Sequence, residues 1–101
     1  MNRIWIIALS LVISTTAQAQ PDYERCDAVA RLAEEVARSY QAGVSLSRVL
    51  ELSPPEEAYR DLVVLIYSSS TRYFTPKMQE REIAEWRNRF HVDCLRRVRV
   101  E

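Results

Sequence analysis

The chain has 101 residues, with 14 Lys and Arg against 14 Asp and Glu, so its formal net charge is zero. This length excludes a multidomain enzyme, and the balanced charge excludes binding of nucleic acid by bulk positive charge. The single glycine argues against an all-β sandwich, because tight hairpins need glycine where φ is positive. The composition therefore indicates one small helical domain.

The start of the sequence has the three-part layout of a secretory signal peptide. Arg3 supplies the positive charge, residues 4–13 are mostly apolar, and residues 17–19 read Ala-Gln-Ala, which is typical of a cleavage site. The apolar run is about half of the ~20 residues that a membrane-spanning helix needs. We therefore expect residues 1–19 to be removed and residues 20–101 to form a single helical domain without a stable membrane anchor, in the periplasm or outside the cell.

The mature region begins with two predicted helices. Apolar residues at three- and four-residue spacing predict a helix over 22–41. Gly43 stands where a residue in the left-handed conformation commonly ends a helix. Ser45 is placed to cap a short second helix over 45–52.

A third helix is predicted over 54–68. The segment Ser53-Pro54-Pro55-Glu56 has the form of a capping box, with a serine N-cap, proline in the first turn and a glutamate three residues after the serine. Residues 62–67 are apolar nearly all round, which predicts the most buried element of the fold. The hydroxyl side chains of residues 68–71 compete for backbone hydrogen bonds and end the helix.

Thr75-Pro76 repeats the cap-and-proline start and predicts a fourth helix over 76–97. Four helices joined by connections of about two to eight residues predict an all-α fold. The arrangement is expected to be either a small antiparallel four-helix bundle or a compact orthogonal array.

The two cysteines carry the strongest tertiary prediction. Cys26 lies near the start of the first helix and Cys94 near the end of the fourth, each on an apolar face. Two thiols in an exported protein usually pair, and no C-x-x-C motif suggests redox activity. A disulfide between them sets the first and last helices antiparallel and closes a long loop, which stabilises the fold by about 4 kcal/mol in the chain-entropy model.

No group of residues predicts catalysis or metal binding, so we expect no cofactor and no enzyme activity. His91 lies three residues before Cys94, but structural zinc needs four ligands, and an oxidised sulfur neither binds metal nor attacks a substrate. Neighbouring glutamates point in different directions around a helix and do not share one cleft. One glycine cannot build a phosphate-binding loop.

Two segments are candidates for binding a partner protein. Arg72, Tyr73 and Phe74 lie in the loop before the fourth helix, where the aromatic pair either anchors a partner or folds over the end of the bundle. The second segment is a basic tail, which either complements the dipole at the helix C-terminus or contacts a partner. It consists of Arg96, Arg97 and Arg99.

A family resemblance adds to these predictions. The pattern consists of Cys26, Tyr40-x-x-Gly43-Val-Ser45, Ile66-Tyr67, Pro76 and Phe90-x-x-x-Cys94. It resembles small exported helical proteins of Gram-negative bacteria and their phages. These motifs are caps, core aromatics and terminal cysteines, so the resemblance implies a fold and no reaction. A looser likeness is to the HdeA-type acid-stress chaperones, which are also small, helical, periplasmic and closed by one disulfide, and which expose apolar surface when acidified.

The sequence thus predicts a non-enzymatic protein-interaction module of the inhibitor, immunity-protein or envelope-adaptor kind. Its expected partner is another envelope or secreted protein. An acid-stress chaperone is one alternative, because protonating the 14 carboxylates leaves the bases charged and makes the chain strongly positive. A small envelope enzyme is the second alternative.

Overall fold

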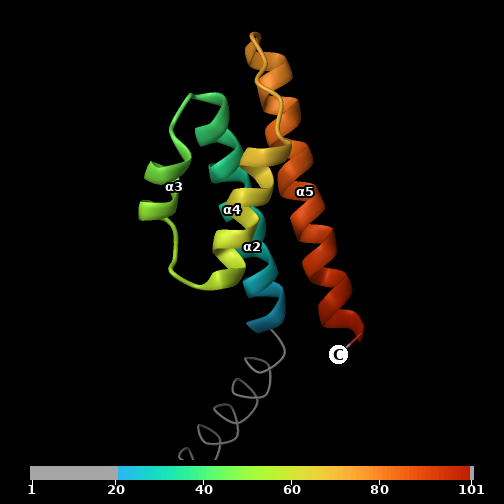
Figure 1. Ribbon diagram of the computed structural model, residues 1–101. Coiled ribbons are helices and arrows are strands. Elements are labelled where there is room, and N and C mark those ends of the chain that lie inside the picture. The colour runs from blue at the N-terminus through green and yellow to red at the C-terminus, as the bar shows by residue number, and fades with distance from the viewer. Residues whose placement is uncertain (1–20, 101) are drawn as a thin grey trace, which may run out of the picture.

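The computed structural model describes residues 21–100, which form four helices and their connections. The predicted signal peptide lies outside the described residues. The helices run alternately up and down, and this confirms an all-α antiparallel bundle (Figure 1). They are α2 (Pro21–Gln41), α3 (Leu46–Leu52), α4 (Glu57–Ser69) and α5 (Pro76–Val100).

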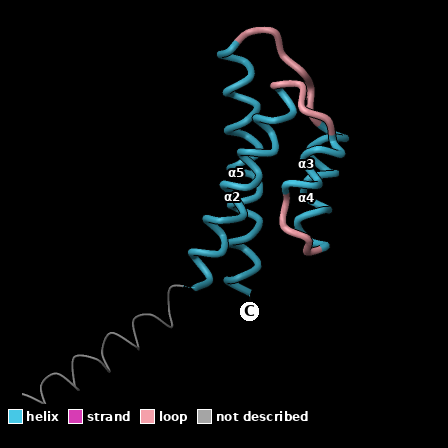
Figure 2. Tube along the Cα trace, turned by 90° about the vertical axis from the view of Figure 1, so that its left-hand side faces the viewer, coloured by secondary structure: helices cyan, strands magenta, loops and turns pink. Residues whose placement is uncertain are grey.

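The helices form two layers. α2 and α5 lie side by side along most of their length, and α3 and α4 form the second layer, which covers another side of α2 (Figure 2). Ala30, Ala33 and Ala37 are buried on α2, and these small side chains allow the neighbouring helices to approach closely. The core also takes larger side chains from every helix: Val36, Val49, Leu62, Val63, Ile66, Ile83 and Trp86.

The connection between α2 and α3 follows the sequence prediction. Gly43 has a φ of 84°, and its N–H donates to the carbonyl of Tyr40 at 3.1 Å. The N–H of Val44 donates to the carbonyl of Ser39 at 3.0 Å, which completes a Schellman motif. The predicted cap at Ser45 is also confirmed, since its Oγ accepts a hydrogen bond from the Arg48 N–H at 3.2 Å.

The predicted capping box at residues 53–56 is wrong. α4 begins at Glu57, and Glu56 is an N-cap without a side-chain hydrogen bond. Ser53 instead ends α3 in an extended conformation, and its Oγ donates to the carbonyl of Val49 at 2.7 Å. A residue before proline is pushed out of the helical region, and the tandem prolines impose this on both Ser53 and Pro54. The helix therefore starts later than predicted.

α4 is buried on one face only. Leu62, Val63 and Ile66 are at most 5% exposed, whereas Val64 is 41% and Leu65 is 46% exposed. The expectation that α4 would be the most buried element is therefore wrong. α4 packs on α2 and α3 but makes little contact with α5, which leaves part of its apolar surface uncovered.

α5 begins as predicted and extends further than predicted. The Oγ1 of Thr75 accepts a hydrogen bond from the Met78 N–H at 3.3 Å, which is the expected cap. The helix then continues to Val100, beyond the predicted end at residue 97.

The Cys26–Cys94 disulfide is confirmed and joins α2 to α5 at one end of the bundle. The two Cα atoms are 5.5 Å apart, and Cys26 is completely buried. Since Cys26 is near the start of α2 and Cys94 near the end of α5, the bond holds the two helices antiparallel.

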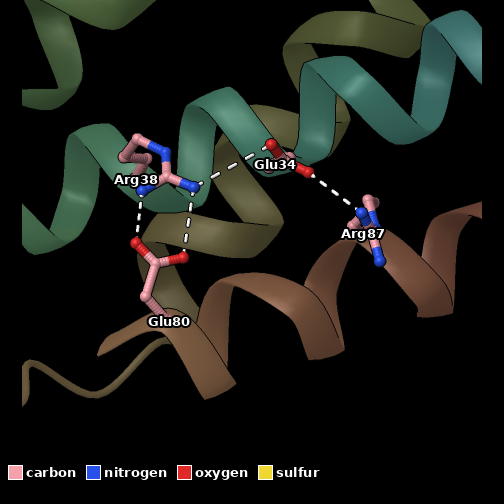
Figure 3. Close-up of polar contacts among 4 residues, drawn as sticks. All are labelled: Glu34, Arg38, Glu80 and Arg87. Atoms are coloured by element: carbon pink, nitrogen blue, oxygen red, sulfur yellow. Dashed lines mark hydrogen bonds and ion pairs between the residues drawn. The ribbon is translucent and has the colours of Figure 1, made fainter. Parts of the chain in front are cut away.

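Ion pairs follow one edge of the contact between α2 and α5 (Figure 3). The Arg38 guanidinium donates to both carboxylate oxygens of Glu80, at 2.6 and 3.2 Å. It also lies 3.9 Å from Glu34, which in turn pairs with Arg87 at 3.4 Å. Alternating charges from the two helices therefore favour one register of α5 along α2.

Replacing both cysteines, as Cys26→Ala together with Cys94→Ala, is expected to lower the free energy of unfolding by about 4 kcal/mol. The bond closes a loop of 68 residues, whose entropy the unfolded chain regains when the bond is removed. Urea denaturation measures the change, and the reduced wild type serves as a control because it should lose a similar amount. A loss below about 1 kcal/mol would contradict the role assigned to the bond.

The stability of the α2–α5 contact is expected to depend on pH through Glu80. The hydrogen bonds from Arg38 lower the pKa of the Glu80 carboxyl below its ordinary value of 4.5. Folding therefore favours the charged carboxylate, so its contribution is present above pH 4.5 and is lost as the pH falls through the lowered pKa.

Glu80→Gln should accordingly lower Tm at pH 7 but leave it close to that of the wild type near pH 2, as measured by circular dichroism. Glu35→Gln is the matched control, because Glu35 is exposed on α2 and no ion pair to it occurs within residues 21–98. An equal loss at both pH values would count against the ion pair as the cause.

Candidate functional site

The loop of residues 70–75 is tied down over the C-terminal end of α2. The Tyr40 hydroxyl donates to the carbonyl of Ser70 at 3.1 Å. The Gln41 Nε2 donates to the carbonyl of Thr71 at 2.7 Å. These contacts hold the loop to a helix that is distant in sequence but adjacent in space.

Gln41 is the main anchor of this loop. It is the last residue of α2 and is only 8% exposed. Besides donating to Thr71, its side chain accepts a hydrogen bond at Oε1 from the Tyr73 N–H at 3.0 Å. One amide group thereby satisfies backbone groups on both sides of Arg72. Sequence reasoning missed this residue, and the available signal was its position four residues after Ala37 on the apolar face of α2.

Arg72 is engaged within the molecule. Its guanidinium lies over the Tyr40 ring, with 5.6 Å between Cζ and the ring centroid, and donates to the Tyr40 carbonyl at 3.3 Å. It also lies close to Gly43, where a Cβ atom would come within 3.7 Å of an Arg72 nitrogen. Of the three candidates in this loop, Arg72 therefore fixes the loop to the end of α2.

The two aromatic residues of the loop have different surroundings. Tyr73 is half-buried, and its carbonyl accepts a hydrogen bond from the Gln79 Nε2 at 2.8 Å. Phe74 is 99% exposed. The two neighbouring aromatic residues therefore differ: Tyr73 is partly shielded from solvent, whereas Phe74 extends into it.

The basic tail lies at the other end of α5. Arg96 and Arg97 are exposed, and Arg97 pairs with Asp93 at 3.1 Å. The side chain of Arg99 lies outside the described residues. Because α5 rises by 1.5 Å per residue, Arg96 is about 30 Å from the start of the helix. The two candidate segments therefore do not form one site.

The residues considered for metal chemistry lie beside the disulfide. His91 Nε2 is 3.2 Å from an Asp27 carboxylate oxygen, so the imidazole joins α5 to α2. The described part of the chain contains no group of three or more side chains arranged to hold a metal ion. Among residues 21–100, no helix combines the length and the apolar character that crossing a membrane requires.

Comparison with known proteins identifies no family for this chain. No protein-family model matches the chain, and neither a curated protein nor a solved structure matches it. The resemblance to exported helical proteins stays a prediction. The candidate site is therefore defined by its geometry: a hydrogen-bonded loop that presents one exposed phenylalanine.

Gln41→Ala is expected to loosen this loop and to cost about 1 to 3 kcal/mol of stability, because the partners of the buried amide lose their hydrogen bonds. Hydrogen exchange at the Tyr73 amide should become faster, while exchange in the core of α2 should change only with the global stability. Phe74→Ala is the control and should leave the free energy of unfolding unchanged, since Phe74 is 99% exposed. Unchanged exchange at Tyr73 in Gln41→Ala would show that the amide does not hold the loop.

Proposed function

We propose that this protein is a non-enzymatic interaction module, exported to the periplasm or secreted, which binds another envelope or secreted protein by inserting Phe74 into an apolar pocket. The observation that carries the proposal is the 99% exposure of Phe74 on a loop fixed by hydrogen bonds. An inhibitor, an immunity protein or an envelope adaptor would each use such a contact.

The exposure of Phe74 supports a binding role because it brings the fold no benefit. Moving a phenylalanine side chain from water into an apolar site is worth about 1.5 to 3 kcal/mol, and in the free protein this energy is unused. Aromatic side chains that enter a pocket near the centre of an interface often dominate the binding energy. Phe74 is therefore placed to contribute to association.

The fixed backbone around Phe74 supports the same role. Gln41 and Gln79 hold the backbone of Tyr73 from both sides, and the Thr75 Oγ1 caps the helix that follows. A side chain presented by an ordered loop loses less conformational entropy on binding than one presented by a flexible loop. The loop is thus organised before a partner arrives.

Export is supported by the predicted signal peptide together with the Cys26–Cys94 disulfide. Disulfides form and persist in oxidising compartments such as the periplasm and the extracellular space. The same compartment would contain the proposed partner.

A photoreactive phenylalanine analogue at position 74 tests the proposal in the cells that make the protein. We expect it to crosslink one protein, which is then purified to measure its affinity for the wild type and for Phe74→Ala. The substitution should weaken binding at least tenfold, since truncating an anchoring aromatic residue costs about 2 kcal/mol or more. Leu52→Ala is the matched control, because Leu52 is also apolar and is 72% exposed on α3.

Two results would contradict the proposal. One is an affinity of Phe74→Ala equal to that of the wild type, with both variants folded by circular dichroism. The other is binding only to unfolded proteins, only near pH 2 to 3 and independent of Phe74, which is the behaviour of an acid-stress chaperone.

A further inference from the structure

The segment around Phe74 carries positive charge. Residues 68–79 contain two bases, Arg72 and Lys77, and neither aspartate nor glutamate. Both bases are exposed. The connection from α4 and the first turns of α5 extend beyond the ends of α2, α3 and α4, so this segment forms one tip of the bundle (Figures 1 and 2). A protein that receives Phe74 therefore approaches a positively charged surface.

Lys77 supplies the first of these charges, and it makes no polar contact inside the molecule. It is the only lysine of the chain, whose other basic residues are all arginines. Its ammonium group forms neither an ion pair nor a hydrogen bond with the residues that the structure describes. It lies in the first turn of α5, which contains no acidic residue. Because a helix N-terminus carries a partial positive charge, a cation there is unfavourable. Neither a local charge pair nor the helix dipole therefore accounts for a lysine at this position.

Arg72 supplies the second charge and holds it in a fixed place. Its guanidinium lies over the Tyr40 ring, with 5.6 Å between Cζ and the ring centroid, and donates to the Tyr40 carbonyl. Neither contact neutralises the guanidinium, and no carboxylate of residues 21–98 pairs with it. Arg72 precedes Phe74 by two residues, and Lys77 follows it by three. One unpaired base therefore stands on each side of Phe74 in the chain.

The acidic side chains that follow in α5 leave this surface positive. The Glu80 carboxylate is bound by the Arg38 guanidinium. Glu85 pairs at 3.6 Å with the arginine one turn before it. Glu82 is half-buried and accepts a hydrogen bond from the Trp86 Nε1 at 3.1 Å. Within residues 68–85, two unpaired bases thus outweigh the one acid that has no cationic partner.

We infer that the protein pocket that receives Phe74 is bordered by carboxylates, which lie opposite Lys77 and Arg72. This inference rests on the proposed function and adds the chemistry of the partner to it. Opposite charges at the edge of an interface speed association, and they select against pockets with basic edges. Phe74 would then supply most of the affinity, while the two bases choose among the apolar pockets that could accept a phenylalanine.

A protein pocket fits this surface better than a lipid membrane does. Proteins that lie on anionic membranes typically insert the broad apolar face of an amphipathic helix and place bases along its edges. Residues 70–75 instead present one fully exposed apolar side chain, Phe74, on a loop fixed by hydrogen bonds. A single rigid anchor of this kind is typical of a contact with a matching pocket.

Crosslinking with a carbodiimide tests the predicted contact directly, because this reagent joins a lysine amine to a carboxyl group that touches it. The wild type is mixed with envelope proteins of the cells that make it, and joined peptides are identified by mass spectrometry. Since Lys77 is the only lysine, its product is distinguished from that of the amino terminus. We expect Lys77 to be joined to an aspartate or glutamate of the protein that the photoreactive analogue at position 74 captures.

Binding to that purified protein measures the effect of the charge. Lys77→Glu should weaken binding about tenfold, mainly through slower association, and the difference from the wild type should shrink at high salt. Lys77→Arg should bind like the wild type. Arg31→Glu is the matched control, because Arg31 is exposed on α2 and forms no ion pair with residues 21–98. Lys77→Glu places an acid in the first turn of α5, which favours the helix, so its Tm should not fall.

Two results would overturn the inference and leave the proposed function standing or revise it. If Lys77→Glu binds as tightly as the wild type while Phe74→Ala binds weakly, the pocket has no acidic border. If the wild type cosediments with vesicles of anionic phospholipid and Phe74→Ala does not, Phe74 enters lipid. Equal binding of the purified protein by Phe74→Ala and the wild type would instead contradict the proposed function, and the inference would fail with it.

Discussion

The antiparallel contact between α2 and α5 is the constraint on which the rest of the structure depends. The Cys26–Cys94 disulfide fixes one end of it covalently, and the Arg38–Glu80 pair joins the helices near the other end. Between them, Ala33 and Ala37 of α2 are buried in the same core cluster as Trp86 of α5. A small domain has little apolar surface to bury, so a covalent bond across its longest contact accounts for much of its stability.

The position of the Phe74 loop and the exposed apolar surface of α4 both follow from this contact. Because α5 lies along α2, the connection from α4 passes over the C-terminal end of α2. There the Gln41 side chain forms hydrogen bonds with the backbone of this connection, and Phe74 remains exposed to solvent. Because α5 packs along α2, its backbone approaches that of α4 at few points, and Leu65 of α4 remains 46% exposed.

The sequence predicted those features that depend on neighbouring residues. The positive φ of Gly43 and the caps at Ser45 and Thr75 were predicted because each is decided within one turn of chain. The start of α4 was not predicted correctly, because two consecutive prolines outweigh a local capping pattern. The difference between half-buried Tyr73 and exposed Phe74 was not predicted either, since the backbone of the loop is held by Gln41, which is distant in sequence. The exposed apolar surface of α4 depends on how α4 packs relative to α5, and no local pattern encodes that.

The central claim is that the α2–α5 contact holds the loop of residues 70–75 in one conformation with Phe74 exposed. Backbone ¹⁵N relaxation of the oxidised protein tests it most directly. A fixed loop should give order parameters for residues 71–74 close to about 0.85, the value of a rigid backbone. Values below about 0.6 across these residues would mean that the loop is flexible and would contradict the account.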